Sequence, residues 1–176
     1  GLVYLGFTRW VGVDLNAWWV DREQIRGDIL WSILGTIAIL VVTVASVLLL
    51  AGIFPETRAP PAGTSTPPSG ATGVGVGSSG AIVNLFLGLF FGFAIAAFQE
   101  ETLFRGFLQQ LLHEQWGRSV AILGQSVVFT LAHLGYYPVS AWPLLFVVFL
   151  VGLVTGWLVD RRGTLLSAGI AHGFVG

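Results

Sequence analysis

The chain has 176 residues, of which 55% are hydrophobic and only 10% are charged, and its formal net charge is −1. Soluble domains usually contain about 25% charged residues, so this composition indicates an integral membrane protein. The near-neutral charge gives no basis for nucleic-acid binding. The absence of cysteine excludes disulfides and thiolate chemistry in this chain.

Residues 1–28 mix tryptophans with charged side chains, as at Trp18 and Trp19. This mixture predicts a segment at the membrane interface, with the tryptophans as anchors. Residues 29–54 are uncharged and apolar over a length that can cross a ~30 Å hydrocarbon core, so they are the predicted first transmembrane helix. Residues 55–80 are rich in proline, glycine, serine and threonine, which predicts a disordered loop outside the membrane.

The remaining part, residues 81–176, is predicted to form a helical core. One long helix is expected over 81 to about 116, with further spans at 119–134 and 142–160 and the start of a fifth at 164–176. We therefore expect an all-α polytopic transmembrane bundle with four full spans and a truncated fifth. The chain lacks an initial methionine and its last apolar run has no polar flank, so we expect it to be part of a longer protein.

Two further patterns concern packing and orientation. The pairs Gly88/Gly92 and Gly152/Gly156 have the small-xxx-small spacing that lets membrane helices approach closely. With these spans, one side of the membrane carries a single arginine, Arg58. The N-terminal side carries Arg9, Arg22, Arg26, Arg118, Arg161 and Arg162. The positive-inside rule then predicts a multi-pass cell-membrane protein with its N-terminal side in the cytoplasm.

Glu100 and Glu101 are adjacent glutamates inside an apolar helix. An acidic side chain at bilayer depth costs several kcal/mol, so such residues indicate a functional site by default. Arg105 follows Glu101 by four residues, a spacing that favours an ion pair along one helix face. Glu100 points about 100° away and is predicted to be the working carboxylate. The structural alternative is an ion-pair network, which needs only one carboxylate.

His133 and His172 also lie in apolar runs. At ~1.5 Å rise per residue, Glu100, His133 and His172 lie ~18, ~21 and ~12 Å from the same membrane side. Three helices thus bring ionisable groups to a similar level. A carboxylate beside neutral histidines can activate water, while another donor stabilises the developing oxyanion. Hydrolysis uses all of these groups together.

The residues Glu100-Glu101-x-x-x-Arg105, then Phe129-x-x-x-His133, then His172 resemble the three motifs of the CPBP family. This family comprises type II CAAX prenyl proteases and the bacteriocin-processing or immunity-related membrane proteases, also called Abi. The resemblance covers about residues 81–176. It implies a prokaryotic glutamate-type intramembrane endopeptidase whose site opens toward the cytoplasmic side. The implied substrate is a membrane-associated, prenylated or leader peptide, and no cofactor or metal is implied.

The resemblance also implies individual roles. Glu100 with His133 would activate the water, without a covalent intermediate. His172, with an asparagine or aspartate four residues later, would form the oxyanion hole. The sequence departs from the family pattern here, because the fourth position after His172 is Gly176.

Three other functions remain open on the sequence. Gly176 favours a non-catalytic membrane immunity or scaffold protein of the same fold. Glu100, His133 and His172 could instead form the zinc site of a metal-dependent membrane protease, although no His-Glu-x-x-His motif is present and Arg105 would oppose a cation. A transporter could use the carboxylates as proton relays, but few helices and no inverted repeat are visible.

Overall fold

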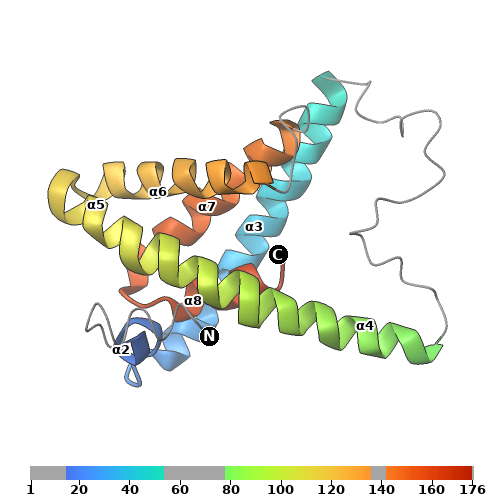
Figure 1. Cartoon of the computed structure of the whole chain (residues 1–176), viewed down its shortest axis with the longest axis horizontal. Coiled ribbons are helices and arrows are strands. Elements are labelled where there is room, and N and C mark those ends of the chain that lie inside the picture. The colour runs from blue at the N-terminus through green and yellow to red at the C-terminus, as the bar shows by residue number, and fades with distance from the viewer. Residues whose placement is uncertain (1–14, 54–77, 136–141, 176) are drawn as a thin grey trace.

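The structure, a computed structural model, describes residues 15–53, 78–135 and 142–175. Within these ranges it contains helices and no strand, which confirms the predicted all-α class (Figure 1). Most of the predicted 55–80 linker lies outside the described residues, although Ser78 already begins a helix. In chain order the helices are α2 Leu15–Trp19, α3 Ile25–Ile53, α4 Ser78–Phe91, η3 Gly92–Leu108, α5 Gln109–Trp116, α6 Arg118–Ala132, η4 His133–Gly135, α7 Trp142–Arg162 and α8 Leu166–Gly173.

Three of the described helical stretches are long and apolar enough to cross a membrane, namely Ile25–Ile53, Leu85–Trp116 and Trp142–Arg162. The predicted count of four full spans plus a fifth is not confirmed. Helix α6 has 15 residues and α8 has 8. At ~1.5 Å per residue, α6 is about 22 Å long and falls short of a ~30 Å hydrocarbon core.

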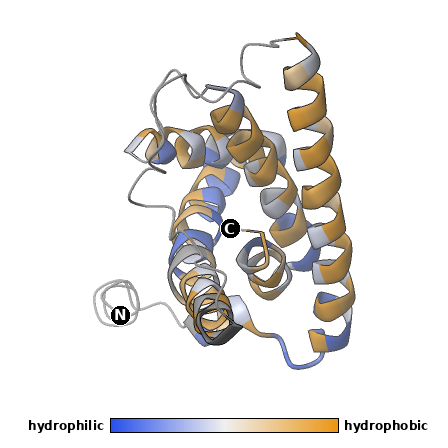
Figure 2. Cartoon of the chain, turned by 90° about the vertical axis from the view of Figure 1, so that its right-hand side faces the viewer, coloured by the Kyte–Doolittle hydropathy of each residue, from blue (hydrophilic) through white to orange (hydrophobic). Residues whose placement is uncertain are grey.

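Helix α3 presents two different faces. Its buried residues include Asp28, Gly35 and Ile39, whereas Leu30, Val41 and Leu48 are exposed apolar side chains. Figure 2 shows this helix as an almost continuous apolar column along one side of the molecule. An apolar surface of this kind suits contact with lipid, because hydrocarbon does not penalise exposed aliphatic side chains.

Helices α4, η3 and α5 follow one another without a break from Ser78 to Trp116, in agreement with the predicted long helix (Figure 1). The middle section η3 has π-helical hydrogen bonding, and at its end the N–H of Gln109 donates to the carbonyl of Phe104, five residues earlier. π-Helical turns are rare and frequently occur at functional sites. Glu100 and Glu101 both lie in this section.

A tight turn at Gly117 reverses the chain between α5 and α6. Gly117 has φ +80°, a conformation that L side chains rarely adopt, so glycine is needed there. Helix α6 then packs against both α5 and α7. Its Gln125 side chain donates to the carbonyl of Gly152 at 2.8 Å, and Gln109 donates to the carbonyl of Gly156 at 2.9 Å.

The predicted close packing at the glycine pairs is confirmed in part. A Cβ at Gly152 would lie 3.1 Å from the Ser126 side chain, and one at Gly156 would overlap the Gln125 side chain. Gly92 is similarly close to the carbonyl of Gly173, at 2.8 Å. The exception is Gly88, which has no neighbour within 4 Å in the described structure.

Helix α8 is the short central helix of the bundle, in contact with α3, α7 and η3. It shares an apolar core with α3 and α7, made of Ile39, Leu158, Val159, Leu165, Ala168 and Ala171. A buried polar anchor joins the same elements. Asp28 is fully buried, accepts from Arg162 Nε at 2.7 Å and accepts from the Thr164 hydroxyl at 3.0 Å.

The predicted role of Trp18 and Trp19 as interface anchors stays a prediction, but the structure adds contacts that the sequence did not predict. Both side chains pack inward against the core cluster of α3, α7 and α8. Trp19 also hydrogen-bonds to Thr102 of η3. Composition alone suggested anchors because tryptophans beside charges are typical of interfacial segments.

Candidate active site

The expected i,i+4 ion pair on η3 is present. Arg105 Nη1 lies 3.2 Å from Glu101 Oε1, and both side chains are fully buried. The Arg105 guanidinium also lies over the ring of Phe129, with Cζ 4.1 Å from the ring centroid. A buried arginine is therefore held between a carboxylate and an aromatic face, the two neighbours that best compensate its charge.

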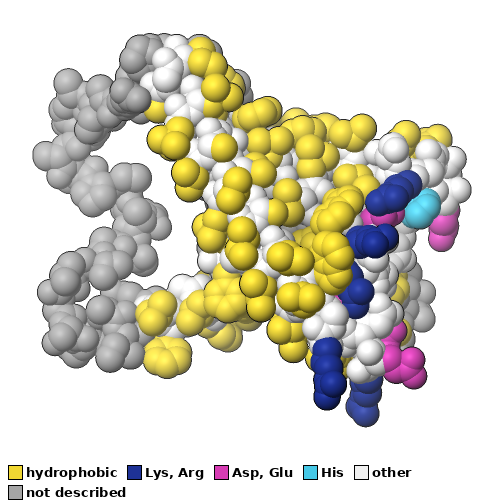
Figure 3. Space-filling view, turned by 180° about the vertical axis from the view of Figure 1, so that it is seen from behind, with side chains coloured by type: hydrophobic (Ala, Val, Ile, Leu, Met, Phe, Trp, Pro, Cys, Tyr) yellow, Lys and Arg dark blue, Asp and Glu magenta, His cyan; other side chains and the backbone are white. Residues whose placement is uncertain are grey.

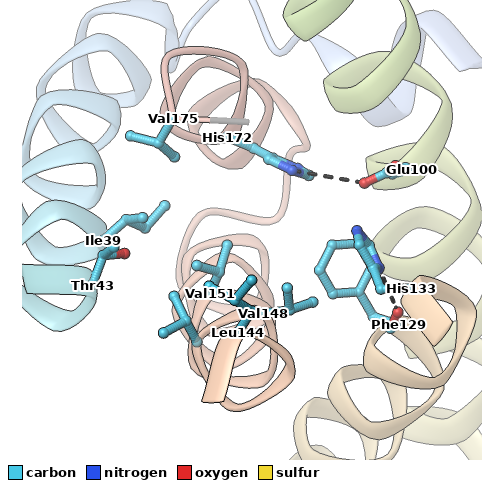
Figure 4. A pocket seen from close by; sticks show the side chains of 11 residues that line it. Ile39, Thr43, Glu100, Phe129, His133, Leu144, Val148, Val151, His172 and Val175 are labelled. Carbon is cyan, nitrogen blue, oxygen red and sulfur yellow. Dashed lines mark hydrogen bonds and ion pairs between the residues drawn. The ribbon is translucent and has the colours of Figure 1, made fainter. Parts of the chain in front are cut away.

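His172 lies between the two glutamates. Its Nδ1 is 2.8 Å from Glu101 Oε1, and its Nε2 is 3.7 Å from Glu100 Oε2. Because an ionised carboxylate can only accept, Nδ1–H donates to Glu101. Glu101 thus orients the imidazole. Figure 4 shows the His172 ring directed toward Glu100. The sequence predicted Arg105 as the partner of Glu101 and did not predict this second contact.

His133 follows the last residue of α6. Its Nδ1 lies 2.8 Å from the carbonyl oxygen of Phe129, and its ring lies 4.5 Å from the Phe129 ring (Figure 4). A carbonyl can only accept, so Nδ1 carries the proton, and in the neutral ring Nε2 bears a lone pair. His133 is thus held in the tautomer that a proton acceptor at Nε2 requires.

Phe129 connects these groups, and its importance was missed in the sequence. It is almost fully buried and lies edge-on to both histidines, 5.9 Å from the ring of His172. Arg105 covers its face. Its position four residues before His133 was visible in the motif, but a lone phenylalanine in an apolar run is ordinarily a packing residue. Only the three-dimensional structure shows that it supports a cation and two imidazoles together.

Glu100, His133 and His172 all line one cavity of about 290 Å³ (Figure 4). The Glu100 side chain is 27% exposed, whereas Glu101 and Arg105 are fully buried and do not line the cavity. Apart from the Phe129 ring and the polar side chain of Thr43, the remaining lining is aliphatic and comes from α3, α7 and the turn after α8: Ile39, Leu144, Val147, Val148, Val151 and Val175.

The alternative zinc site finds no support in this geometry. Among the described residues, no three histidine, cysteine, aspartate or glutamate side chains converge closely enough to hold a metal ion. The predicted absence of metal and cofactor stays a prediction. Gly176, the position at which the sequence departs from the family motif, lies outside the described residues.

Together the fold and the site define a class: a helical membrane protein in which a carboxylate and two histidines meet at the wall of an apolar cavity. A family model described as "Type II CAAX prenyl endopeptidase Rce1-like" matches residues 82–176. The match covers more than half of the chain and contains Glu100, Glu101, Arg105, His133 and His172.

The chain therefore belongs to the Rce1-like family of type II CAAX prenyl endopeptidases, which confirms the CPBP resemblance. It is thus a membrane protein of a protease family. No curated protein and no solved structure was found to match the chain. Helices α2 and α3 precede the matched residues, although α3 contributes two side chains to the cavity.

Proposed function

We propose that this chain is an intramembrane endopeptidase that hydrolyses a peptide bond of a membrane-associated peptide by direct attack of water. One observation carries the proposal: Glu100, His133 and His172, from three different elements, line the same cavity. These groups can accept a proton, orient water and donate to an oxyanion, and hydrolysis of an amide needs all three actions.

In the proposed reaction, the water lies between Glu100 and Nε2 of His133. Glu100 takes its proton as the water oxygen bonds to the substrate carbonyl carbon, and the carbonyl oxygen becomes an oxyanion. The proton then passes to the leaving nitrogen as the C–N bond breaks, which yields an acid and an amine. The hydrogen bond of His133 to the carbonyl of Phe129 supports this role, because it leaves Nε2 as the accepting nitrogen.

His172 is the proposed donor to the oxyanion. Because Nδ1–H donates to Glu101, His172 would donate to the oxyanion as an imidazolium, with its Nε2–H directed into the cavity. Arg105 balances the charge of Glu101 within the buried cluster. The two glutamates therefore have different proposed roles: Glu100 accepts the proton, and Glu101 orients the histidine that stabilises the intermediate.

The proposed substrate is apolar near the scissile bond, because the cavity wall opposite Glu100 is aliphatic. Prenylated tails and leader peptides both satisfy this requirement. The proposed location is the cell membrane, with the site opening toward the cytoplasm. The exposed arginines of the described residues gather at one edge of the molecule, away from the broad apolar surface, as Figure 3 shows.

The test is a cleavage assay with the purified chain in lipid vesicles. Prenylated and unprenylated peptides of the same sequence are offered to the parent and to Glu100→Gln. We expect the substitution to lower kcat at least about 100-fold, because the amide cannot accept a proton. Glu114→Gln is the matched control, since Glu114 is exposed on α5.

Two outcomes would contradict this proposal. Turnover by Glu100→Gln at the parental rate would exclude Glu100 as the proton acceptor. Activity that disappears with a strong chelator and returns with zinc would replace the proposed mechanism by metal-dependent hydrolysis.

A further inference from the structure

Helix α2 lies against both elements that carry the acid–histidine contacts. η3 carries Glu100 and Glu101, and α8 carries His172. The carbonyl of Trp18 accepts the backbone N–H of Leu165, immediately before α8, at 2.8 Å. The Trp18 ring lies so close to η3 that a Cβ on Gly106 would be 2.7 Å from it. This short helix is therefore fixed to η3 and α8 together.

Trp19 contacts η3 on both sides of the glutamate pair. Its indole Nε1–H donates to the Thr102 hydroxyl at 3.0 Å, and that hydroxyl donates to the carbonyl of Phe98 at 2.6 Å. The indole also stacks on the Phe98 ring, with centroids 5.1 Å apart. Phe98 lies two residues before Glu100, and Thr102 directly follows Glu101.

The same indole contacts α8. A Cβ placed on Gly169 would lie 2.5 Å from the Trp19 ring, so glycine is the residue that admits this approach. Gly169 lies three residues before His172, about one helical turn away. One rigid ring thus occupies the space between the helix with the glutamates and the helix with the histidine.

We propose that Trp19 is a positioning residue, which sets the spacing of η3 and α8 and thereby the contacts of His172 with Glu100 and Glu101. Those contacts, at 3.7 and 2.8 Å, cross the same interface that the indole fills. The inference rests on the proposed function for its catalytic consequence. Trp19 lies outside residues 82–176, so membership of the family does not assign it this role.

The test compares substitutions that distinguish the contribution of the indole N–H donor from that of the aromatic ring. Trp19→Phe keeps an aromatic ring and removes the donor, whereas Thr102→Val removes the acceptor and Thr102→Ser retains it. Trp157→Phe is the matched control, because its indole pairs with Trp31 on the α3–α7 side at 5.4 Å. The readouts are kcat, KM, the folded fraction, and the ring ¹⁵N signals of the three histidines in the chain.

We expect Trp19→Phe and Thr102→Val each to lower kcat about tenfold, with KM changed by less than about twofold, because small displacements of reacting groups act on the rate. The double variant should be no slower than either single variant, since both remove the same hydrogen bond. Both should move the His172 ring signals and leave those of His113 unchanged. Thr102→Ser and Trp157→Phe should behave like the parent.

Unchanged kcat and unchanged His172 signals in Trp19→Phe would overturn the positioning role. A fall in activity that only follows the folded fraction, with His172 signals unchanged, would overturn it as well, because Trp19 would then act on stability alone. The NMR readout needs no turnover. If Glu100→Gln retained parental activity, the proposed function would fail, and the His172 signals would still decide the role of Trp19.

Discussion

Arg105 carries a charge in the interior of the protein, where a charge is costly unless neighbouring groups compensate it. It is fully buried, 3.2 Å from Glu101 and 4.1 Å from the centroid of the Phe129 ring. A planar guanidinium can pair with a carboxylate and stack on a ring at once, whereas a lysine ammonium can serve only as a point charge. The residue type at position 105 therefore follows from these two neighbours.

We predict that Arg105→Ala lowers the free energy of unfolding by about 3–5 kcal/mol, because it leaves Glu101 buried without its cation. Arg105→Lys should restore part of this loss, since it returns the charge but not the stacking. Thermal unfolding of the purified variants in detergent measures the effect. Arg26→Ala serves as the control at an exposed arginine. An Arg105→Ala protein as stable as the parent would show that the ion pair contributes nothing to the fold.

At the scale of the elements, the contact between α6 and α7 depends on glycines, whose missing side chains let the neighbouring helix approach the backbone. Gly156 leaves room for Gln125 and Gln109, and the amide of Gln109 donates to the Gly156 carbonyl. Small residues let helix backbones approach this closely where lipid gives no hydrophobic driving force. A methyl group at position 156 would force both glutamine side chains to move.

We predict that Gly156→Ala destabilises the protein by about 1–3 kcal/mol through overpacking. Gly88→Ala is the matched control, because a Cβ there meets nothing within 4 Å. It should leave stability unchanged or raise it slightly, since alanine favours helix by about 1 kcal/mol over glycine. Equal effects of the two substitutions, measured by thermal unfolding, would show that Gly156 does not lie at a close contact between α6 and α7.

The sequence predicted an element wherever a long apolar run marked it, or wherever a polar residue interrupted such a run. The long helix carrying Glu100 and Glu101 followed from its apolar run, and His133 and His172 were noticed because they interrupt such runs. The contact between His172 and Glu101 could not be predicted from the sequence, since it depends on how η3 and α8 pack. Residues 119–134 were predicted as a span from their apolar character, but α6 has only 15 residues and is too short to cross a ~30 Å hydrocarbon core.

At the scale of the whole molecule, helices α2 and α3 pack against residues 82–176, the part of the chain that matches the family. Helix α3 contributes Ile39 and Thr43 to the cavity. Its N-terminal end is fixed by Asp28, which binds Arg162 and Thr164 at the α7–α8 junction. Neither Asp28 nor Arg162 stood out in the sequence, because charges beside a span are usually solvated. The part of the cavity wall that α3 forms is thus held in place by an ion pair between Asp28 and Arg162, which are far apart in the sequence.

The distribution of the arginines predicts how the protein is oriented in the membrane. The chain contains no cysteine, so single cysteines can be labelled without background. Glu114→Cys places one on the exposed surface of α5, and Ser69→Cys places one in the predicted linker, outside the described residues. The stretch Leu85–Trp116 can cross a membrane; it begins after Ser69, and Glu114 lies near its C-terminal end.

In intact bacterial cells, a membrane-impermeant maleimide should label Ser69→Cys at once and Glu114→Cys only after permeabilisation. The physical reason is that arginine-rich segments stay on the cytoplasmic side during insertion. The parent protein, which has no cysteine, is the negative control, and permeabilised cells give the maximum labelling of each variant. Labelling of Glu114→Cys alone would reverse the orientation and place the arginine-rich edge of Figure 3 outside the cell. Labelling of both in intact cells would mean that the helix between them does not cross the membrane.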